Sequence, residues 1–193
     1  MGSPAKKGMH KYTYADYKTW PDDERWEIID GEPYAMTPAP SVAHQTILFN
    51  ISGIFRDIFK GKSCQPFIAP TDVILDEANI VQPDFFIVCD KGKITKANIQ
   101  GAPDLVVEIL SPATSLKDRR EKKALYERFG VNEYLIVYPE DEVVDRYRLV
   151  NGKYAVEDVF GWDETIRLHA FPDMELYLPE VFGKEAPQEE TAT

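Results

Sequence analysis

Two acidic residues of the 193-residue sequence stand at or inside apolar segments, where charge is unusual. Asp84 opens the run DFFIVC and Glu108 lies within DLVVEIL, and both runs have the composition of buried strands. A carboxylate inside a buried strand is costly unless it is ion-paired or bound to a cation. Mg²⁺ is held in proteins by one or two carboxylates with waters and phosphate, so Asp84 and Glu108 are candidate ligands for Mg²⁺ or Mn²⁺. The structural alternative is a glutamate at a strand end that pairs with an arginine.

A lysine is the expected companion of such carboxylates, because the commonest metal-dependent nucleases carry Glu-x-Lys on the strand. Here Leu110 occupies the lysine position. A helix predicted from Ser115 to Phe129 offers a substitute. At about 100° per residue, Lys122 falls in the middle of the apolar face of this helix, between Leu125 and Tyr126. Either its stem packs along the core while the ammonium reaches water, or the ammonium reaches the carboxylates and replaces the missing strand lysine.

Two further residues have inward positions that are compatible with a site. His44 projects onto the centre of the apolar stripe of a helix predicted from Ser41 to Phe59. An inward histidine near a helix start is more often a hydrogen-bonded structural residue than a catalytic one, although its titration near neutral pH suits proton transfer. Glu27 lies in the run WEIID and is either a third site carboxylate or a surface charge on an edge strand.

The helix that carries Lys122 is also locally basic. Residues 117–128 contain six basic and three acidic side chains, in a chain whose net charge is −11. This net charge argues against a protein that coats nucleic acid through lysine and arginine, but an enzyme that meets phosphate through a metal ion needs acidic ligands. Arg119, Arg120 and Lys123 on the outer side are candidates for steering a DNA backbone; a solvated helix face is the structural alternative.

The elements that would position these residues follow a mixed α/β order. Thr13–Trp20 is predicted as a short helix that begins with a capping box, and Asp30-Gly31 is a turn dipeptide between two strand-like runs. A buried strand at Glu133–Pro139 precedes a second hairpin that turns at Asn151-Gly152. We expect an α/β (α+β) fold in which helices flank a central mixed sheet with added N-terminal and C-terminal hairpins. Further strands are predicted at Gln65–Ala69, Asp72–Leu75, Asp84–Cys89 and Asp104–Leu110.

One domain covers residues 11–182 in this interpretation. Residues 1–10 are predicted to form a flexible arm and residues 183–193 an acidic disordered tail, because neither has enough apolar side chains to bury. The segment 97–101 is predicted to be a loop that leads into a strand, and the segment 171–180 is also loop-like.

Cellular location is predicted from cysteines and apolar runs. Cys64 and Cys89 are 25 residues apart with no Cys-x-x-Cys motif and no cysteine–histidine cluster, which favours a reducing compartment and no structural zinc. The N-terminal segment shows no apolar run of the secretory type, and no run approaches the roughly 18 residues that a membrane span needs. We therefore expect a cytoplasmic protein without a membrane segment.

Several motifs of the sequence occur in an order that resembles a large bacterial family of restriction-endonuclease-like proteins. The resemblance extends over roughly Tyr12–Phe182, and PDLVVEILSPAT with the following helix is its most specific part. The family was long catalogued as a domain of unknown function and belongs to the PD-(D/E)XK phosphodiesterase superfamily. Its motifs here are YADYKTWPDDERWEIIDGEPYAM, PSVAHQ, VQPDFFIV, PDLVVEILSPAT and KDRREKKALYERFGVNEYLIVYP.

The resemblance implies a restriction-endonuclease-like core, a divalent-metal site and a set of site residues. Leu110 departs from the superfamily pattern, and this departure is shared by the family, which points to a relocated lysine. The matches to the family's motifs are Asp84 and Glu108 as its acidic pair, Lys122 four residues before Tyr126, Glu27 in a Glu-x-x-x-Gly pattern, and His44 in Pro-Ser-x-x-His.

The function implied by these residues is metal-assisted hydrolysis of DNA phosphodiester bonds. Asp84 and Glu108 would hold Mg²⁺ or Mn²⁺, which activates a bound water and neutralises charge on the phosphate, and Lys122 would orient or stabilise the reacting groups. A homodimer is expected by analogy with nucleases of this kind. The alternative is a catalytically inactive nuclease-fold protein that binds nucleic acid or a protein partner.

Overall fold

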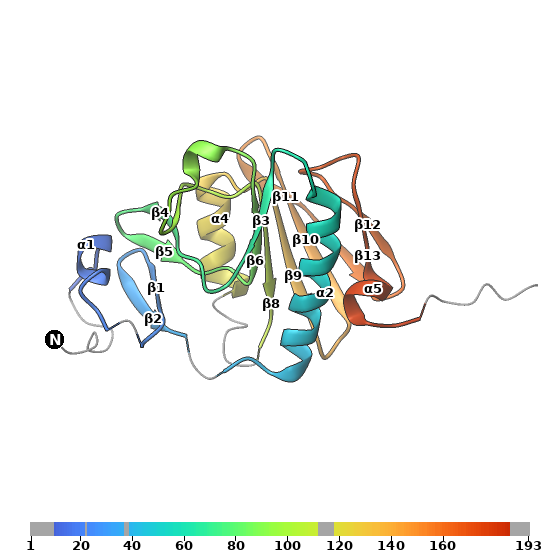
Figure 1. The fold of residues 1–193 in the computed structure, drawn as a ribbon, viewed down its shortest axis with the longest axis horizontal. Helices are drawn as coiled ribbons and strands as arrows, with labels where there is room; N and C mark the ends of the chain where they lie inside the picture. The colour runs from blue at the N-terminus through green and yellow to red at the C-terminus, as the bar shows by residue number, and fades with distance from the viewer. Residues whose placement is uncertain (1–9, 22, 37–38, 112–117, 186–193) are drawn as a thin grey trace, which may run out of the picture.

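A computed structural model describes residues 10–21, 23–36, 39–111 and 118–185 (Figure 1). Its strands form a five-stranded sheet, a six-stranded sheet and a two-stranded sheet, and the six-stranded sheet is the central mixed sheet that the sequence predicted. Most of the predicted arm and tail lies outside the described residues, as does Ser115, the predicted helix cap.

The N-terminal hairpin joins the five-stranded sheet, which has the order β2-β1-β5-β4-β7. Its turn residues Asp30 and Gly31 both have positive φ angles, 51° and 76°, as the two-residue turns of β-hairpins require. The capping box of the short helix α1, Tyr14–Tyr17, is present as predicted. The strands of this sheet are β1 (Trp26–Ile29), β2 (Glu32–Ala35), β4 (Val73–Asp76), β5 (Asn79–Val81) and β7 (Ile99–Gln100).

The six-stranded sheet is the central one and has the order β11-β10-β9-β8-β6-β3. Strands β8 and β9 run parallel, and the other neighbours are antiparallel, so the sheet is mixed as predicted. Strands β8 and β6 have five and four residues of almost complete burial, which explains their largely apolar composition. The strands are β3 (Gln65–Ile68), β6 (Phe85–Val88), β8 (Leu105–Ile109), β9 (Glu133–Tyr138), β10 (Val143–Val150) and β11 (Lys153–Gly161).

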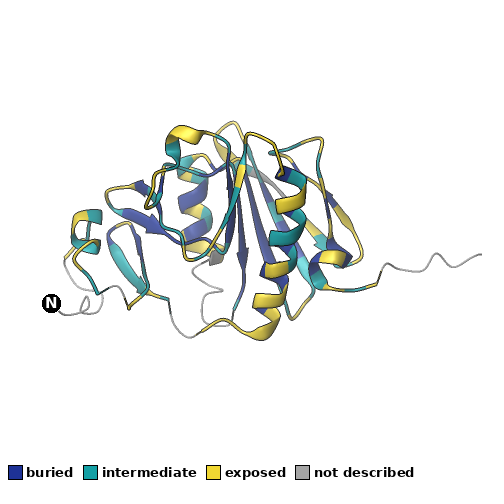
Figure 2. Ribbon diagram, in the orientation of Figure 1, coloured by how far each residue is buried: buried dark blue, intermediate teal, exposed yellow. Residues whose placement is uncertain are grey.

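Helices cover both faces of the central sheet (Figures 1 and 2). Helix α2, Val42–Phe59, buries its apolar stripe against one face, where Leu105 and Val107 of β8 point. Helix α4, Lys123–Phe129, packs on the opposite face with Val106. Because side chains alternate along a strand, Glu108 points to the same face as Val106, toward α4.

The C-terminal region contains elements that the sequence analysis missed. The segment interpreted as a loop at 171–180 includes strand β13 (Glu175–Tyr177) and the start of helix α5 (Leu178–Phe182), and β13 pairs with β12 (Thr165–Arg167). The predicted loop at 97–101 likewise contains β7. These strands have two or three residues each, too few for a periodic pattern, and they depend on partners distant in sequence.

The oxidation state of the two cysteines also differs from what the sequence had favoured. Cys64 and Cys89 form a disulfide, although their spacing had favoured a reducing compartment. The register of β3 and β6 explains their proximity, because Gln65 faces Val88 and the two cysteines are the next pair along. Spacing in the sequence does not reveal strand register, so this pairing was not predictable from it.

Candidate active site

The two candidate carboxylates lie on neighbouring strands of the central sheet. Asp84 immediately precedes β6, Glu108 lies in β8, and Phe85 of β6 faces Val107 of β8. The Ile109 main-chain N–H donates a hydrogen bond to Asp84 Oδ2 at 2.8 Å, so the Asp84 carboxylate is fixed to the backbone next to Glu108. The antiparallel pairing of β6 and β8 therefore brings together two acidic residues that are 24 positions apart in sequence.

Lys122 reaches the carboxylates from the helix, in the inward orientation that its projection predicted. Its ammonium lies 2.7 Å from Glu108 Oε1 and 2.8 Å from Glu27 Oε1. Lys122 ends a π-helical turn, Asp118–Lys122, that leads directly into α4. Single π-helical turns within helices occur frequently at functional sites, because the extra residue shifts side chains relative to a regular helix.

The three charges are removed from solvent almost completely. The side chains of Lys122, Glu27 and Glu108 are 2%, 0% and 4% exposed. Burying ions costs several kcal/mol each, and apolar residues in their place are often neutral or stabilising. The presence of two carboxylates and one ammonium in this buried position is therefore better explained by a function than by a contribution to the stability of the fold.

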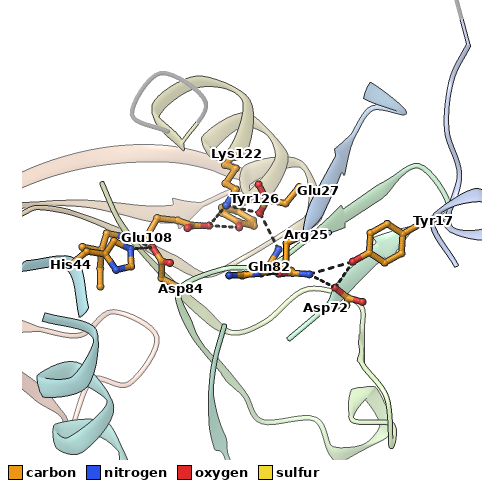
Figure 3. A network of polar contacts seen from close by, with 11 residues as sticks. Tyr17, Arg25, Glu27, His44, Asp72, Gln82, Asp84, Glu108, Lys122 and Tyr126 are labelled. Carbon is orange, nitrogen blue, oxygen red and sulfur yellow. Dashed lines mark hydrogen bonds and ion pairs between the residues drawn. The ribbon is translucent and has the colours of Figure 1, made fainter. Parts of the chain in front are cut away.

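Tyr126 and Gln82 each donate a further hydrogen bond to one of the buried carboxylates (Figure 3). The Tyr126 hydroxyl, one helical turn after Lys122, donates to Glu108 Oε1 at 2.8 Å. The Gln82 main-chain N–H donates to Glu27 Oε1 at 3.0 Å. Glu27 thus lies inside the candidate site rather than on an edge-strand surface, although it comes from the five-stranded sheet.

His44 lies at the other end of the site, beside Asp84. Its Nε2 is 3.1 Å from Asp84 Oδ2, and its side chain is 7% exposed against 18% for Asp84. Helix α2 positions it near its first turn, where the Ser41 side chain accepts a hydrogen bond from the His44 N–H at 3.2 Å. Asp84 is the more exposed of these site carboxylates, so access from solvent is easiest at the His44–Asp84 end.

The basic residues proposed to steer DNA are not part of this cluster. Arg119 and Arg120 are exposed. Lys123 is only partly exposed, because its ammonium lies 3.7 Å from the centroid of the Tyr147 ring. No contact within the described residues connects the three to the buried carboxylates, and they remain candidates for a surface role only.

The sequence analysis missed a second polar group that adjoins the site. Gln82 is 6% exposed and connects Glu27 to Arg25, Tyr17 and Asp72. None of these residues stands out by apolar periodicity. The one available signal was the position of Gln82 directly before Pro83-Asp84.

Asp84 and Glu108 offer a hard divalent cation two carboxylates, which are ligands of the type that such a cation prefers. Both polar contacts of the Asp84 carboxylate within the described residues go to Oδ2, which leaves Oδ1 for a ligand. Glu108 is its adjacent carboxylate, and Mg²⁺ often binds through one or two carboxylates plus waters. No group of three or more histidine, cysteine, aspartate or glutamate residues in the described ranges is arranged to hold a metal.

The arrangement of strands and helices has a clear counterpart among solved structures. The chain resembles the crystal structure of a "putative nuclease belonging to DUF820" from Anabaena variabilis, with a TM-score of 0.73 and 19% sequence identity. The superposition covers 89% of this chain and 97% of the other. This likeness confirms the predicted restriction-endonuclease-like α+β fold.

The sequence comparisons define the family. Residues 14–179 match Uma2, described as "Putative restriction endonuclease". An uncharacterized protein, slr1290, from Synechocystis sp. is 31% identical over 143 residues, which cover 71% of this chain and 74% of the relative. The chain therefore belongs to the Uma2 family, as the sequence motifs predicted. In the described part of the chain, no helix has the length and apolar character to cross a membrane.

Proposed function

We propose that this protein is a divalent-metal-dependent phosphodiesterase that hydrolyses DNA. The observation that carries the proposal is the buried convergence of Lys122 with Glu27 and Glu108 beside Asp84. Membership in a family described as "Putative restriction endonuclease" and the fold shared with a protein described as a "putative nuclease" support it.

Asp84 and Glu108 would hold the metal ion, Mg²⁺ or Mn²⁺. When bound, such an ion lowers the pKa of a coordinated water and neutralises charge on the phosphate. The protein's contribution is to fix the Asp84 carboxylate through the Ile109 N–H and His44, so that Oδ1 points away from these partners. This fixation limits the reorganisation needed when a cation binds.

Lys122 would supply a positive charge at a defined position. Its ammonium is fixed by Glu27 and Glu108, and Tyr126 binds the same Glu108 oxygen. A preorganised cation that is shielded from bulk solvent stabilises charge that develops on a phosphate far more than an exposed lysine would. Glu27 is the positioning residue in this scheme, because it holds the ammonium from the side opposite Glu108.

Removal of single carboxylates tests the metal proposal. We expect Asp84→Asn and Glu108→Gln to weaken Mn²⁺ binding in calorimetric titration and to abolish Mg²⁺-dependent cleavage of plasmid and oligonucleotide DNA. Asp57→Asn is the matched control, since Asp57 is an exposed carboxylate of α2 whose side chain is 71% accessible. Mn²⁺ affinity that is equal in all four proteins would exclude Asp84 and Glu108 as ligands.

The second candidate function is binding of nucleic acid or protein without catalysis. The observation that favours it is the occupation of Glu108 Oε1 by both Lys122 and Tyr126, with 3% of Glu108 exposed. A binding module would retain its affinity in Asp84→Asn and would cleave no form of DNA. The same titration and cleavage assays therefore distinguish the two functions.

We further propose that the protein acts in the cytoplasm as a homodimer. Sedimentation equilibrium tests the dimer, and a monomer at all concentrations would refute it. In a reducing cytoplasm the Cys64–Cys89 disulfide would open. Thiol labelling in intact cells therefore tests the location.

A further inference from the structure

Arg25, directly before strand β1, has an unusual hydrogen-bond partner. Its Nε and Nη2 donate to Gln82 Oε1 at 3.0 Å and 2.8 Å. Gln82 is a neutral amide, and within the described residues Arg25 forms no ion pair with a carboxylate. A guanidinium that is oriented by a neutral acceptor keeps its charge available for an anion.

The orientation of the Gln82 amide is itself fixed by neighbours on its other side. Its Nε2 donates to Asp72 Oδ1 at 2.8 Å and to the Tyr17 hydroxyl at 3.3 Å. Burial and the Asp72 carboxylate raise the pKa of Tyr17 far above its usual range, so the hydroxyl remains protonated and donates to Asp72 at 3.0 Å. Both amide donors are thereby used, and the amide oxygen is left to face Arg25.

Arg25 and Gln82 adjoin the candidate active site (Figure 3). Gln82 lies two residues before Asp84, and its main-chain N–H is the donor to Glu27. Arg25 is therefore connected to the Asp84 carboxylate through one short segment, residues 82–84.

We propose that Arg25 binds a backbone phosphate of the nucleic-acid substrate, next to the phosphate that meets Asp84 and Glu108. The inference rests on the proposed function and adds to it a residue that selects phosphodiester oxyanions. The planar guanidinium matches phosphate oxygens through paired N–H groups. Gln82 is the positioning residue, because it directs the guanidinium without cancelling its charge.

The test is the affinity for a fluorescein-labelled DNA duplex, measured by anisotropy over a series of KCl concentrations in EDTA, which prevents metal-dependent cleavage. We expect Arg25→Gln to weaken binding about tenfold, as loss of a charged hydrogen bond does. The slope of log affinity against log salt should fall by about 0.9, the value of one phosphate contact. Arg25→Lys should keep the slope and lose affinity only several-fold. Mn²⁺ affinity should be the same in all three proteins.

Arg56→Gln is the matched control, because Arg56 is an arginine of α2 whose side chain is 74% exposed and pairs with its neighbour Asp57. Equal affinity and slope for Arg25→Gln and the wild type would overturn the inference, as would a parallel loss of Mn²⁺ affinity. If Arg25→Gln does not fold, Arg25→Lys decides: unchanged affinity overturns the inference, and reduced affinity at an unchanged slope supports it. A wild-type protein that binds neither DNA nor Mn²⁺ would instead refute the proposed function.

Discussion

Lys122 occupies a position in which a lysine is rarely found, with its ammonium enclosed by two carboxylates. The free energy of this arrangement depends on all three partners, since each buried charge is compensated by another. Removing Lys122 takes away the ammonium that lies within 2.8 Å of both Glu27 and Glu108. Such broken pairs are far more destabilising than their replacement by apolar side chains.

We therefore expect Lys122→Met to lower the free energy of unfolding by about 3–5 kcal/mol. Urea titration followed by circular dichroism measures this difference. Adding Glu27→Gln to Lys122→Met should recover part of the loss, because one of the two uncompensated charges is removed. A single variant as stable as the wild type would show that the ammonium does not compensate the carboxylates.

Another buried carboxyl, that of Glu133 at the start of β9, affects stability in a different way. Burial raises its pKa above the ordinary value of 4.5, although the Ala170 N–H donates to its Oε2 at 2.9 Å. Between the two pKa values the folded protein holds a proton that the unfolded chain has released. The stability that Glu133 contributes is thus complete below pH 4.5 and is lost as the pH rises through the folded-state pKa.

Glu133→Gln should remove this dependence, because an amide oxygen still accepts from the Ala170 N–H but does not ionise. We expect the variant to gain stability relative to the wild type as the pH rises from 4.5 toward neutrality. Urea titrations at a series of pH values measure the gain. If the difference in the free energy of unfolding between the two proteins does not change with pH, burial does not raise the pKa of Glu133.

At the scale of elements, two glycines have opposite requirements. Gly130 ends α4 with φ +81°, and its N–H donates to the carbonyls of Tyr126 and Glu127. Gly53 lies inside α2, and no atom lies within 4 Å of a Cβ added there. Gly130→Ala should cost about 1 kcal/mol because of its positive φ, whereas Gly53→Ala should add about 0.5–1 kcal/mol of stability. Thermal unfolding of the two variants compares them, and shifts of the same sign would contradict this account.

The elements that were predictable from the sequence are those with a strong local signal. The 3.6-residue apolar spacing located α2 and placed His44 and Lys122 on inner helix faces, and alternation placed Glu108 on the face that α4 covers. In contrast, β5 and β7 have three and two residues, and each pairs with a strand distant in sequence, β1 and β4 respectively. No local pattern marks such strands.

The same distinction applies to the residues of the site. Inward charged side chains were recognisable because they interrupt an apolar pattern, and they carry the contacts among Glu27, Glu108 and Lys122. Arg25 stands in a polar stretch of sequence, and Gln82 stands at the boundary between two apolar runs, so neither interrupts an apolar pattern. Their contact depends on the antiparallel pairing of β1 with β5, which only the folded chain defines.

At the scale of the whole molecule, the site lies where the two larger sheets meet. Glu27 comes from the five-stranded sheet and Glu108 from the central one, and Lys122 of the π-helical turn contacts both. The packing of the two sheets therefore determines the geometry of the candidate site. The disulfide lies apart from this junction, because Cys89 follows the end of β6 opposite to Asp84.

Loss of the disulfide should consequently affect stability without affecting the site. We expect the double substitution Cys64→Ser and Cys89→Ser to lower the free energy of unfolding by about 3 kcal/mol, because the crosslink closes a loop of 25 residues in the unfolded chain. Mn²⁺ affinity should not change, since β3 and β6 remain paired through four residues each. Urea titration and calorimetry measure the two quantities, with the reduced wild type as the control. Reduced metal affinity in the double variant would mean that the far end of β6 helps to position Asp84, and that function requires an oxidising environment.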